Sequence, residues 1–274
     1  MDDRVRASDT EPAGGDQDDV YLESHGSIAW LVLNQPAKRN AVTFAMWRRL
    51  PELLAEFERD PALKVLVLRG AGERAFSAGA DISEFETYRA TSDDSQTYNA
   101  ATDTAQGALG SLSKPTIAMI RGACVGGGCG LAMSCDIRLA DRSAKFAITP
   151  ARLGLVYPVK ITKRLVDLVG PAQAKLMLYT GRTIDAERAA ALGLVDDLCD
   201  AATLEADTVA LAETIAARAQ YSVRGTKRIV DLISAGLSEE NEETLSLRAR
   251  AIDTADYREG VRAFLEKRPA VFGS

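Results

Sequence analysis

The ten residues CVGGGCGLAM, at positions 124–133, constrain the fold of this chain more than any other segment. Four of the ten are glycine, and an apolar run, TIAMIRG at 116–122, comes directly before them. Glycine in a helix interior is less stable than alanine by roughly 0.5–1 kcal/mol, so a cluster of glycines needs a reason in the backbone. We interpret the region as a buried strand, then a glycine-bearing loop that opens a helix.

An earlier part of the chain repeats this order. The Val/Leu run LKVLVLRG (63–70) predicts a buried strand, which leads into the small residues SAGAD (77–81) and a short acidic helix at 80–86. A further strand is expected at CDIRLAD (135–141). Buried strands that alternate with helices predict an α/β domain.

The flanking segments complete the domain organisation. Residues 1–19 are acidic and lack apolar periodicity, which predicts a disordered tail before a core at 20–200. The core begins with two short strands around His25, followed by a helix at 43–60 that has Thr43 as its N-cap. Pro51 inside this helix predicts a kink or a restart. Amphipathic helices with closing glycines dominate from residue 159 onward and make up the region 201–274.

The composition excludes several classes of function. A net charge of −6 argues against nucleic acid as the main partner. The chain has one histidine, His25, so a Ser-His-Asp or Cys-His centre would depend on a residue that lies beside a predicted surface turn. The four cysteines form no C-x-x-C pair, which makes a metal site unexpected. With no signal peptide and no apolar run long enough to cross a membrane, we expect free thiols and a cytoplasmic protein.

The two glycine loops can be interpreted as one site. A helix N-terminus leaves backbone N–H groups free, and small residues allow a ligand oxygen to approach them closely. Two such donors from different loops would stabilise the negative charge that develops on a carbonyl oxygen. The alternative is tight helix–strand packing, and periodicity alone leaves both interpretations open.

Five segments distinguish between these interpretations, because together they form the motifs of a known family. They are NQPAKRNAV (34–42), AFSAGADISEF (75–85), the whole of 114–140, AALGLVD (190–196) and FLEKRP (264–269). In order and spacing they resemble the crotonase superfamily, the enoyl-CoA hydratase/isomerase group. The resemblance implies a spiral of ββα repeats, a C-terminal helical region that forms trimers or hexamers, and an acyl-CoA substrate that supplies the only coenzyme. It also implies an oxyanion hole formed by the backbone N–H groups of Ala80 and Gly127.

The resemblance also assigns residues that bind the substrate. The pantetheine and nucleotide would lie near Lys38, Arg39 and the 74–80 loop, in which Arg74 and Ala78 would bind substrate together with Gly126. Lys267 matches a basic position that contacts CoA from a neighbouring subunit. Asp81 is expected to cap the short helix that follows the loop.

Two departures from the hydratases bear on the reaction. The family's two catalytic glutamates correspond here to Gly130 and Ala151, neither of which can transfer a proton. The segment FAITPARLGLVYP (146–158) resembles methylmalonyl-CoA decarboxylase, in which a tyrosine occupies the position of Tyr157, although the residue at the position of Ala80 is bulkier there. Decarboxylation, or another reaction through an enolate, is therefore favoured over ordinary hydration.

Other interpretations stay open. Tyr157 could simply line an apolar pocket, and Arg152 or Lys160 could bind a carboxylate on the acyl group. The two missing glutamates also fit a non-catalytic protein that binds acyl-CoA. A peptidase on a similar spiral fold would need a histidine near a serine, and His25 precedes the first spiral unit.

Overall fold

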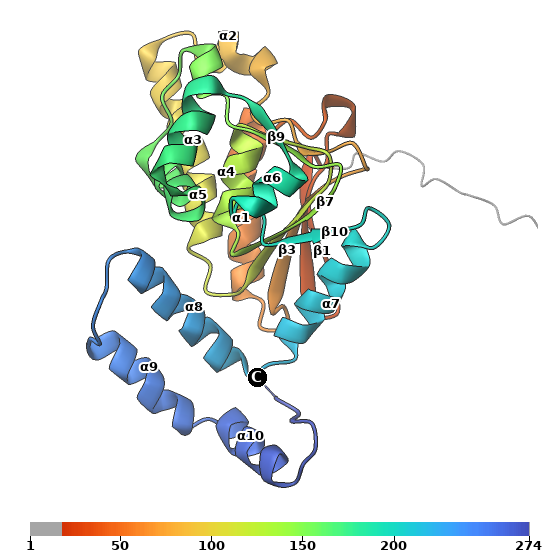
Figure 1. Cartoon of the computed structure of the whole chain (residues 1–274), viewed down its shortest axis with the longest axis vertical. Helices are drawn as coiled ribbons and strands as arrows, with labels where there is room; N and C mark the ends of the chain where they lie inside the picture. Colours follow the sequence, from red (N-terminus) through yellow and green to blue (C-terminus); the bar gives the residue numbers. More distant parts are fainter. Residues whose placement is uncertain (1–17, 274) are drawn as a thin grey trace, which may run out of the picture.

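Two β-sheets lie at the centre of the computed structural model, which describes residues 18–273 (Figure 1). The larger sheet has the order β1-β2-β3-β5-β7-β10, in which only the β1–β2 pair is antiparallel. The smaller sheet has the order β4-β6-β8-β9. The larger contains β1 (Val20–His25), β2 (Ile28–Leu33), β3 (Val65–Gly70), β5 (Thr116–Ile120), β7 (Ile137–Asp141) and β10 (Asp197–Cys199). The smaller contains β4 (Ala75–Ser77), β6 (Ala123–Val125), β8 (Lys145–Ala147) and β9 (Thr183–Asp185).

From β3 to β8 consecutive strands alternate between the two sheets, and helical segments follow each pair. Thus β3 joins the larger sheet and β4 the smaller, and the pairs β5–β6 and β7–β8 repeat this arrangement. The predicted ββα spiral is therefore confirmed. The helical segments after these pairs are η2 (Ile82–Glu84), α2 (Phe85–Tyr88) and α3 (Ser92–Gly110), then α4 (Gly127–Ser134), then η3 (Pro150–Leu153) and α5 (Val159–Thr180).

Helix α1 (Phe44–Arg59) begins where the sequence predicts but does not break at its proline. The Thr43 side chain accepts the N–H of Met46 at 3.2 Å, which confirms the N-cap. The helix does not restart at Pro51, because one helix runs through this position. Proline removes one helical N–H donor, whereas the apolar face of α1, including Trp47 and Phe57, is completely buried. Packing on both sides of the proline keeps the helix together.

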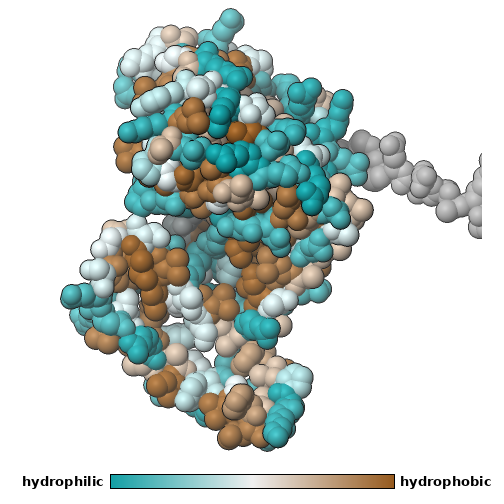
Figure 2. Space-filling model, in the orientation of Figure 1, coloured by the Kyte–Doolittle hydropathy of each residue, from teal (hydrophilic) through white to brown (hydrophobic). Residues whose placement is uncertain are grey.

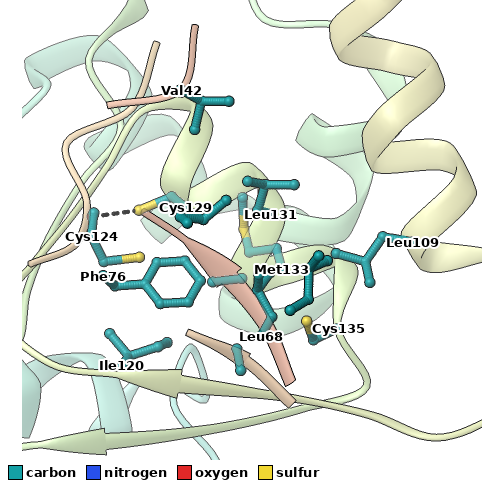
Figure 3. Packing of buried hydrophobic residues seen from close by; sticks show 14 of the residues in the cluster. Val42, Leu68, Phe76, Leu109, Ile120, Cys124, Cys129, Leu131, Met133 and Cys135 are labelled. Carbon is teal, nitrogen blue, oxygen red and sulfur yellow. Dashed lines mark hydrogen bonds between the residues drawn. The ribbon is translucent and has the colours of Figure 1, made fainter. Parts of the chain in front are cut away.

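The buried residues form one main core and a smaller one. The main core fills the space between the sheets and helices α1, α3, α4 and α5 and includes Phe76 and Cys129 (Figure 3). The Cys129 thiol is buried in this core and donates to the Cys124 carbonyl at 2.8 Å. The smaller core lies where α7 (Leu204–Ala216) packs on the larger sheet through Leu204 and Ala212.

The last three helices extend away from the two sheets (Figure 1). They are α8 (Gln220–Ser234), α9 (Glu242–Ile252) and α10 (Ala255–Leu265), whereas α6 (Ala186–Ala191) and α7 stay with the core. The prediction of a helical C-terminal region is confirmed. Lys227 of α8 connects these helices to the core, because its ammonium group donates to an oxygen of Asp136 at 2.8 Å.

A groove of about 1590 Å³ separates α8 from helices α3 and α5. It is visible in the space-filling view as the hollow between the core and the C-terminal helices (Figure 2). Large apolar side chains are exposed on these helices, among them Ile233, Ile252, Phe264 and Leu265.

One prediction concerns residues that lie mostly outside the described part of the chain, and two findings concern what the described part does not contain. The predicted disordered tail lies outside the described residues except for Asp18 and Asp19. Within 18–273, none of the helices combines the length and the apolar character that crossing a membrane requires. Over the same residues, no three His, Cys, Asp or Glu side chains are grouped so that they could hold a metal ion.

Candidate active site

The loop after β4 lies between two other segments of backbone. On one side Ala78 donates its N–H to the Arg39 carbonyl at 2.9 Å, and Val42 donates to the Gly79 carbonyl at 2.7 Å. On the other side Gly79 lies so close to β6 that a Cβ on it would be 2.7 Å from the Val125 carbonyl oxygen. Its φ of +96° also disfavours any side chain. The sequence places glycine here because the two backbones approach closely.

The two predicted oxyanion donors lie close together. Gly127 is the first residue of α4, and a Cβ on it would lie 3.5 Å from the Ala80 backbone nitrogen. In the part of the chain that the structure describes, neither the Ala80 N–H nor the Gly127 N–H has a protein acceptor. The preceding Gly126 has a φ of +53° and donates its own N–H to the Ala147 carbonyl at 2.8 Å, which fixes the turn into the helix. Two free N–H donors at one point can stabilise an anionic oxygen.

Two buried aromatic residues support this turn from behind. The Trp47 ring lies 3.0 Å from the position that a Cβ of Gly127 would occupy. Its indole N–H donates to the Tyr98 hydroxyl at 3.1 Å, and burial raises the pKa of Tyr98 to about 12. The sequence analysis missed both as parts of the site. The apolar spacing of α1 marks Trp47 only as a core residue, and the segment around Tyr98 is mostly polar, so neither carries a signal of the site.

The Tyr157 side chain lies next to Gly126, at the turn into α4. Its hydroxyl is 3.7 Å from the position that a Cβ of Gly126 would take, and the Thr149 hydroxyl is 3.9 Å from the same point. No partner for either hydroxyl is found within residues 18–273. Burial raises the pKa of Tyr157, so the phenol remains a neutral donor at physiological pH. Two hydroxyl groups thus stand beside the oxyanion donors.

The carboxylates nearest in sequence to the oxyanion loop are engaged elsewhere. Asp81 accepts from Lys38 at 2.7 Å and caps η2 by accepting the Ser83 N–H at 3.1 Å. These contacts, that with Lys38 foremost, lower the pKa of Asp81 and keep it ionised. Glu84 accepts the Phe44 N–H at 2.7 Å, at the start of α1. Asp81 therefore caps the short helix as expected, and neither residue is a free proton donor.

The positions of the two absent glutamates differ in their surroundings. Gly130 lies in the first turn of α4, where its N–H donates to the Gly126 carbonyl at 3.1 Å. Its Cα is buried against the side chain of Gln106 from α3. Ala151 lies in η3 and is exposed.

The structure gathers most of the predicted substrate-binding residues but not all. The backbone of Arg39 adjoins Ala78, and the side chain of Lys38 is half exposed beside Asp81. Arg74 is exposed at the start of the same loop. Lys267 follows α10, far from this loop in the single chain (Figure 1).

The two basic alternatives for holding an acyl carboxylate point elsewhere. The Arg152 side chain packs against Gly181, where a Cβ would be 2.9 Å from Nε. Lys160 lines the groove between the core and α8.

The chain thus combines a spiral of ββα repeats with two neighbouring backbone N–H groups that have no protein acceptor within residues 18–273. Comparison with known proteins gives the family. The model of the enoyl-CoA hydratase/isomerase family matches residues 23–274, and the chain belongs to this family.

Relatives and solved structures agree with this assignment. A crotonyl-CoA hydratase from Syntrophomonas wolfei is 32% identical, with 93% of this chain and 98% of the relative covered. A short-chain-enoyl-CoA hydratase from Clostridium acetobutylicum is also 32% identical, with coverages of 91% and 95%. The crystal structure of an enoyl-CoA hydratase/isomerase family protein from Hyphomonas neptunium superposes with a TM-score of 0.90 at 44% identity, covering 93% of this chain and 97% of that one.

Proposed function

We propose that this protein is an enzyme that binds an acyl-CoA thioester and stabilises its enolate with the N–H groups of Ala80 and Gly127. The observation that supports the proposal is that these two N–H groups lie close together and that neither has a protein acceptor in residues 18–273. Removing one donor from such a pair typically costs roughly 3–4 kcal/mol of transition-state stabilisation. The reaction needs no cofactor besides the CoA of the substrate, because the backbone supplies this stabilisation.

Within this class we propose decarboxylation of a malonyl-type thioester in preference to hydration. Hydration needs groups that move protons, and Gly130 and Ala151 replace both glutamates. In decarboxylation the bond between Cα and the carboxylate breaks, CO₂ leaves, and the electron pair becomes the enolate. Cα then takes a proton from water. The neutral Tyr157 hydroxyl would orient the leaving carboxylate beside the oxyanion donors.

The assembly and cellular location are also proposed. A homotrimer or homohexamer would cover the apolar side chains of α8–α10 and bring Lys267 to the CoA of a neighbouring subunit, while Lys38, Arg39 and Arg74 bind CoA from the same chain. The four cysteines are free thiols, which is consistent with the cytoplasm.

The test is a mass-spectrometric screen of the purified protein against crotonyl-, 3-enoyl-, methylmalonyl- and ethylmalonyl-CoA, with binding followed by thermal shift. We expect loss of CO₂ from a malonyl-type ester in the wild-type protein and its disappearance in Tyr157→Phe. Tyr179→Phe is the matched control, because Tyr179 is 72% exposed on α5.

Two other results would change the assignment. Fast addition of water to crotonyl-CoA would refute the argument from the missing glutamates. Binding without turnover of any ester would favour the alternative, a non-catalytic protein that binds acyl-CoA.

A further inference from the structure

The Ala80 and Gly127 N–H groups belong to two segments that are held by different partners. The loop at 78–81 bonds to the main chain of Val42, which both donates to it and accepts from it, whereas the turn at 126–130 bonds to the end of β8. The pairing of β4 with β6 ends before either donor. Within residues 18–273 no backbone hydrogen bond joins this loop to this turn. The separation of the two N–H groups therefore depends on how side chains pack between them.

The indole ring of Trp47 lies where the two segments meet. A Cβ on Gly127 would be 3.0 Å from Cζ2 and 3.4 Å from Cη2 of this ring, and 3.5 Å from the Ala80 nitrogen. One point thus adjoins both donors and the ring. Trp47 is completely buried, and in a close-packed interior the displacement of one group moves its neighbours. A shift of this ring would therefore change the separation of the two donors.

Tyr98 of α3 fixes the polar edge of the indole. The Trp47 N–H donates to the Tyr98 hydroxyl oxygen at 3.1 Å, and both side chains are buried. The Tyr98 ring in turn packs edge-on against Phe85, with the ring centroids 5.7 Å apart. Phe85 is the first residue of α2 and follows the loop that carries Ala80. Trp47, Tyr98 and Phe85, which we call the aromatic bridge, therefore connect the start of α4 with the helix that follows the Ala80 loop.

Arg89 holds the Tyr98 ring independently of the hydroxyl. Its guanidinium carbon lies 4.8 Å from the centroid of the Phe85 ring and 5.1 Å from that of the Tyr98 ring. A cation over an aromatic face is attracted to it. Removing the Tyr98 hydroxyl alone should therefore leave the ring in place and release only the indole N–H.

We propose that Tyr98 is a positioning residue, whose hydroxyl fixes the Trp47 ring and through it the separation of the Ala80 and Gly127 donors. Tyr98 does not touch the substrate in this role. Donors that are already in place cost no reorganisation when charge develops on the carbonyl oxygen, so their spacing affects the enolate more than the neutral thioester. The inference rests on the proposed function, because it assigns the two N–H groups to an enolate oxygen.

The test uses acetoacetyl-CoA, a thioester whose enolate absorbs in the near ultraviolet. Loss of one Cα proton to the buffer leaves the electron pair of the C–H bond on the enolate, so the absorbance reports enolate stabilisation without any further reaction. The full-length wild-type protein should raise the ratio of enolate to keto form above that of the free ester at the same pH. A misplacement of about 1 Å can lower a rate about 10²-fold, and for the smaller shift in Tyr98→Phe we expect this ratio to fall about ten-fold.

Two controls separate positioning from a general loss of structure. The affinity for butyryl-CoA, measured by calorimetry, should change less than about two-fold in Tyr98→Phe, because this ester stays neutral. Tyr88→Phe is the matched variant. Tyr88 is 39% exposed, and within the described part of the chain its hydroxyl has no hydrogen-bond partner. It should keep the wild-type ratio of enolate to keto form.

A double variant tests whether the hydroxyl acts through the indole. Trp47→Phe removes both the indole N–H and the ring atoms that contact Gly127, and it should lower the ratio at least as much as Tyr98→Phe. Adding Tyr98→Phe to Trp47→Phe should cause no further loss, because the hydroxyl has then lost its partner. A second full ten-fold loss in the double variant would show that Tyr98 acts by another route and would overturn the inference. If Trp47→Phe does not fold, the comparison of Tyr98→Phe with Tyr88→Phe decides alone.

The outcomes distinguish this inference from the proposed function. If the wild-type protein binds acetoacetyl-CoA without raising its enolate fraction, or does not bind it, the proposed function fails and this inference fails with it. If the wild type stabilises the enolate and Tyr98→Phe does so equally well, only the role of Tyr98 is overturned. The same holds if Tyr98→Phe and Tyr88→Phe lower the ratio equally.

Discussion

Replacing Gly79 by alanine should damage both the stability of the fold and the oxyanion hole. The added Cβ would lie 2.7 Å from the Val125 carbonyl oxygen and 3.2 Å from the Gly127 nitrogen, and both contacts are with backbone. The φ of +96° alone costs a non-glycine residue about 1–3 kcal/mol. Relief of the overlap adds about 1–3 kcal/mol. We therefore expect a loss of about 2–6 kcal/mol in the free energy of unfolding.

The contact with Gly127 also predicts an effect on catalysis. Separating the loop after β4 from the start of α4 moves the Ala80 and Gly127 donors apart, which should lower kcat about 10²–10³-fold. Stability is measured by urea unfolding at fixed protein concentration, and kcat by turnover of the ester that the CoA screen identifies.

Gly107→Ala is the matched control for this substitution. Gly107 lies inside α3, and a Cβ there has nothing within 4 Å, so alanine should be neutral or stabilising by up to about 1 kcal/mol. Equal stability and equal kcat for Gly79→Ala and wild type would refute the idea that glycine is needed where the two loops meet.

Three further predictions concern charge and burial. Asp81→Asn should reduce the loss of stability between pH 7 and pH 3. Folding lowers the pKa of Asp81, so the ionised carboxylate stabilises the fold above its ordinary pKa, and this stabilisation is lost as the pH falls through the pKa of the folded state. Urea unfolding of wild type and variant at pH 7 and pH 3 measures the difference. The native protein should not react with Ellman's reagent at pH 8, because burial raises the pKa of Cys135 to about 12 and that of Cys199 to about 11; four thiols should react once the chain is unfolded. Lys114→Met should lower the free energy of unfolding by about 1–3 kcal/mol in a chemical denaturation series, because the buried ammonium group donates to the carbonyls of Phe57 and Asp60 near the end of α1.

Local signals in the sequence predicted the elements and some of their ends. The apolar spacing of α1, the cap by Thr43 and the cap by Asp81 depend only on neighbours within a few residues, and all three are confirmed. Pro51 was misjudged because the burial that keeps its helix intact comes from distant strands and helices.

The surroundings of the site depend on how segments far apart in sequence meet. The glycine loops marked the donors, but no pattern in the sequence shows that the amide of Gln106 lies on Gly130 or that Trp47 lies behind Gly127. Both contacts arise where α4 packs against α3 and α1. For the same reason the contact of Lys267 with CoA stays a prediction, since it requires a second chain.

The two donors at Ala80 and Gly127 belong to the main chain, and this limits how mutation can act on the site. Exchanging a side chain cannot delete an N–H group unless the new residue is proline, so the proposed anion-binding function should persist through nearly every point mutation at these two positions that preserves the backbone path. The neighbouring side chains differ in this respect, because a substitution removes their functional groups directly. Under the proposed function, substitutions at positions such as 130, 151 and 157 should therefore change the fate of the enolate, while the backbone groups that stabilise it stay in place.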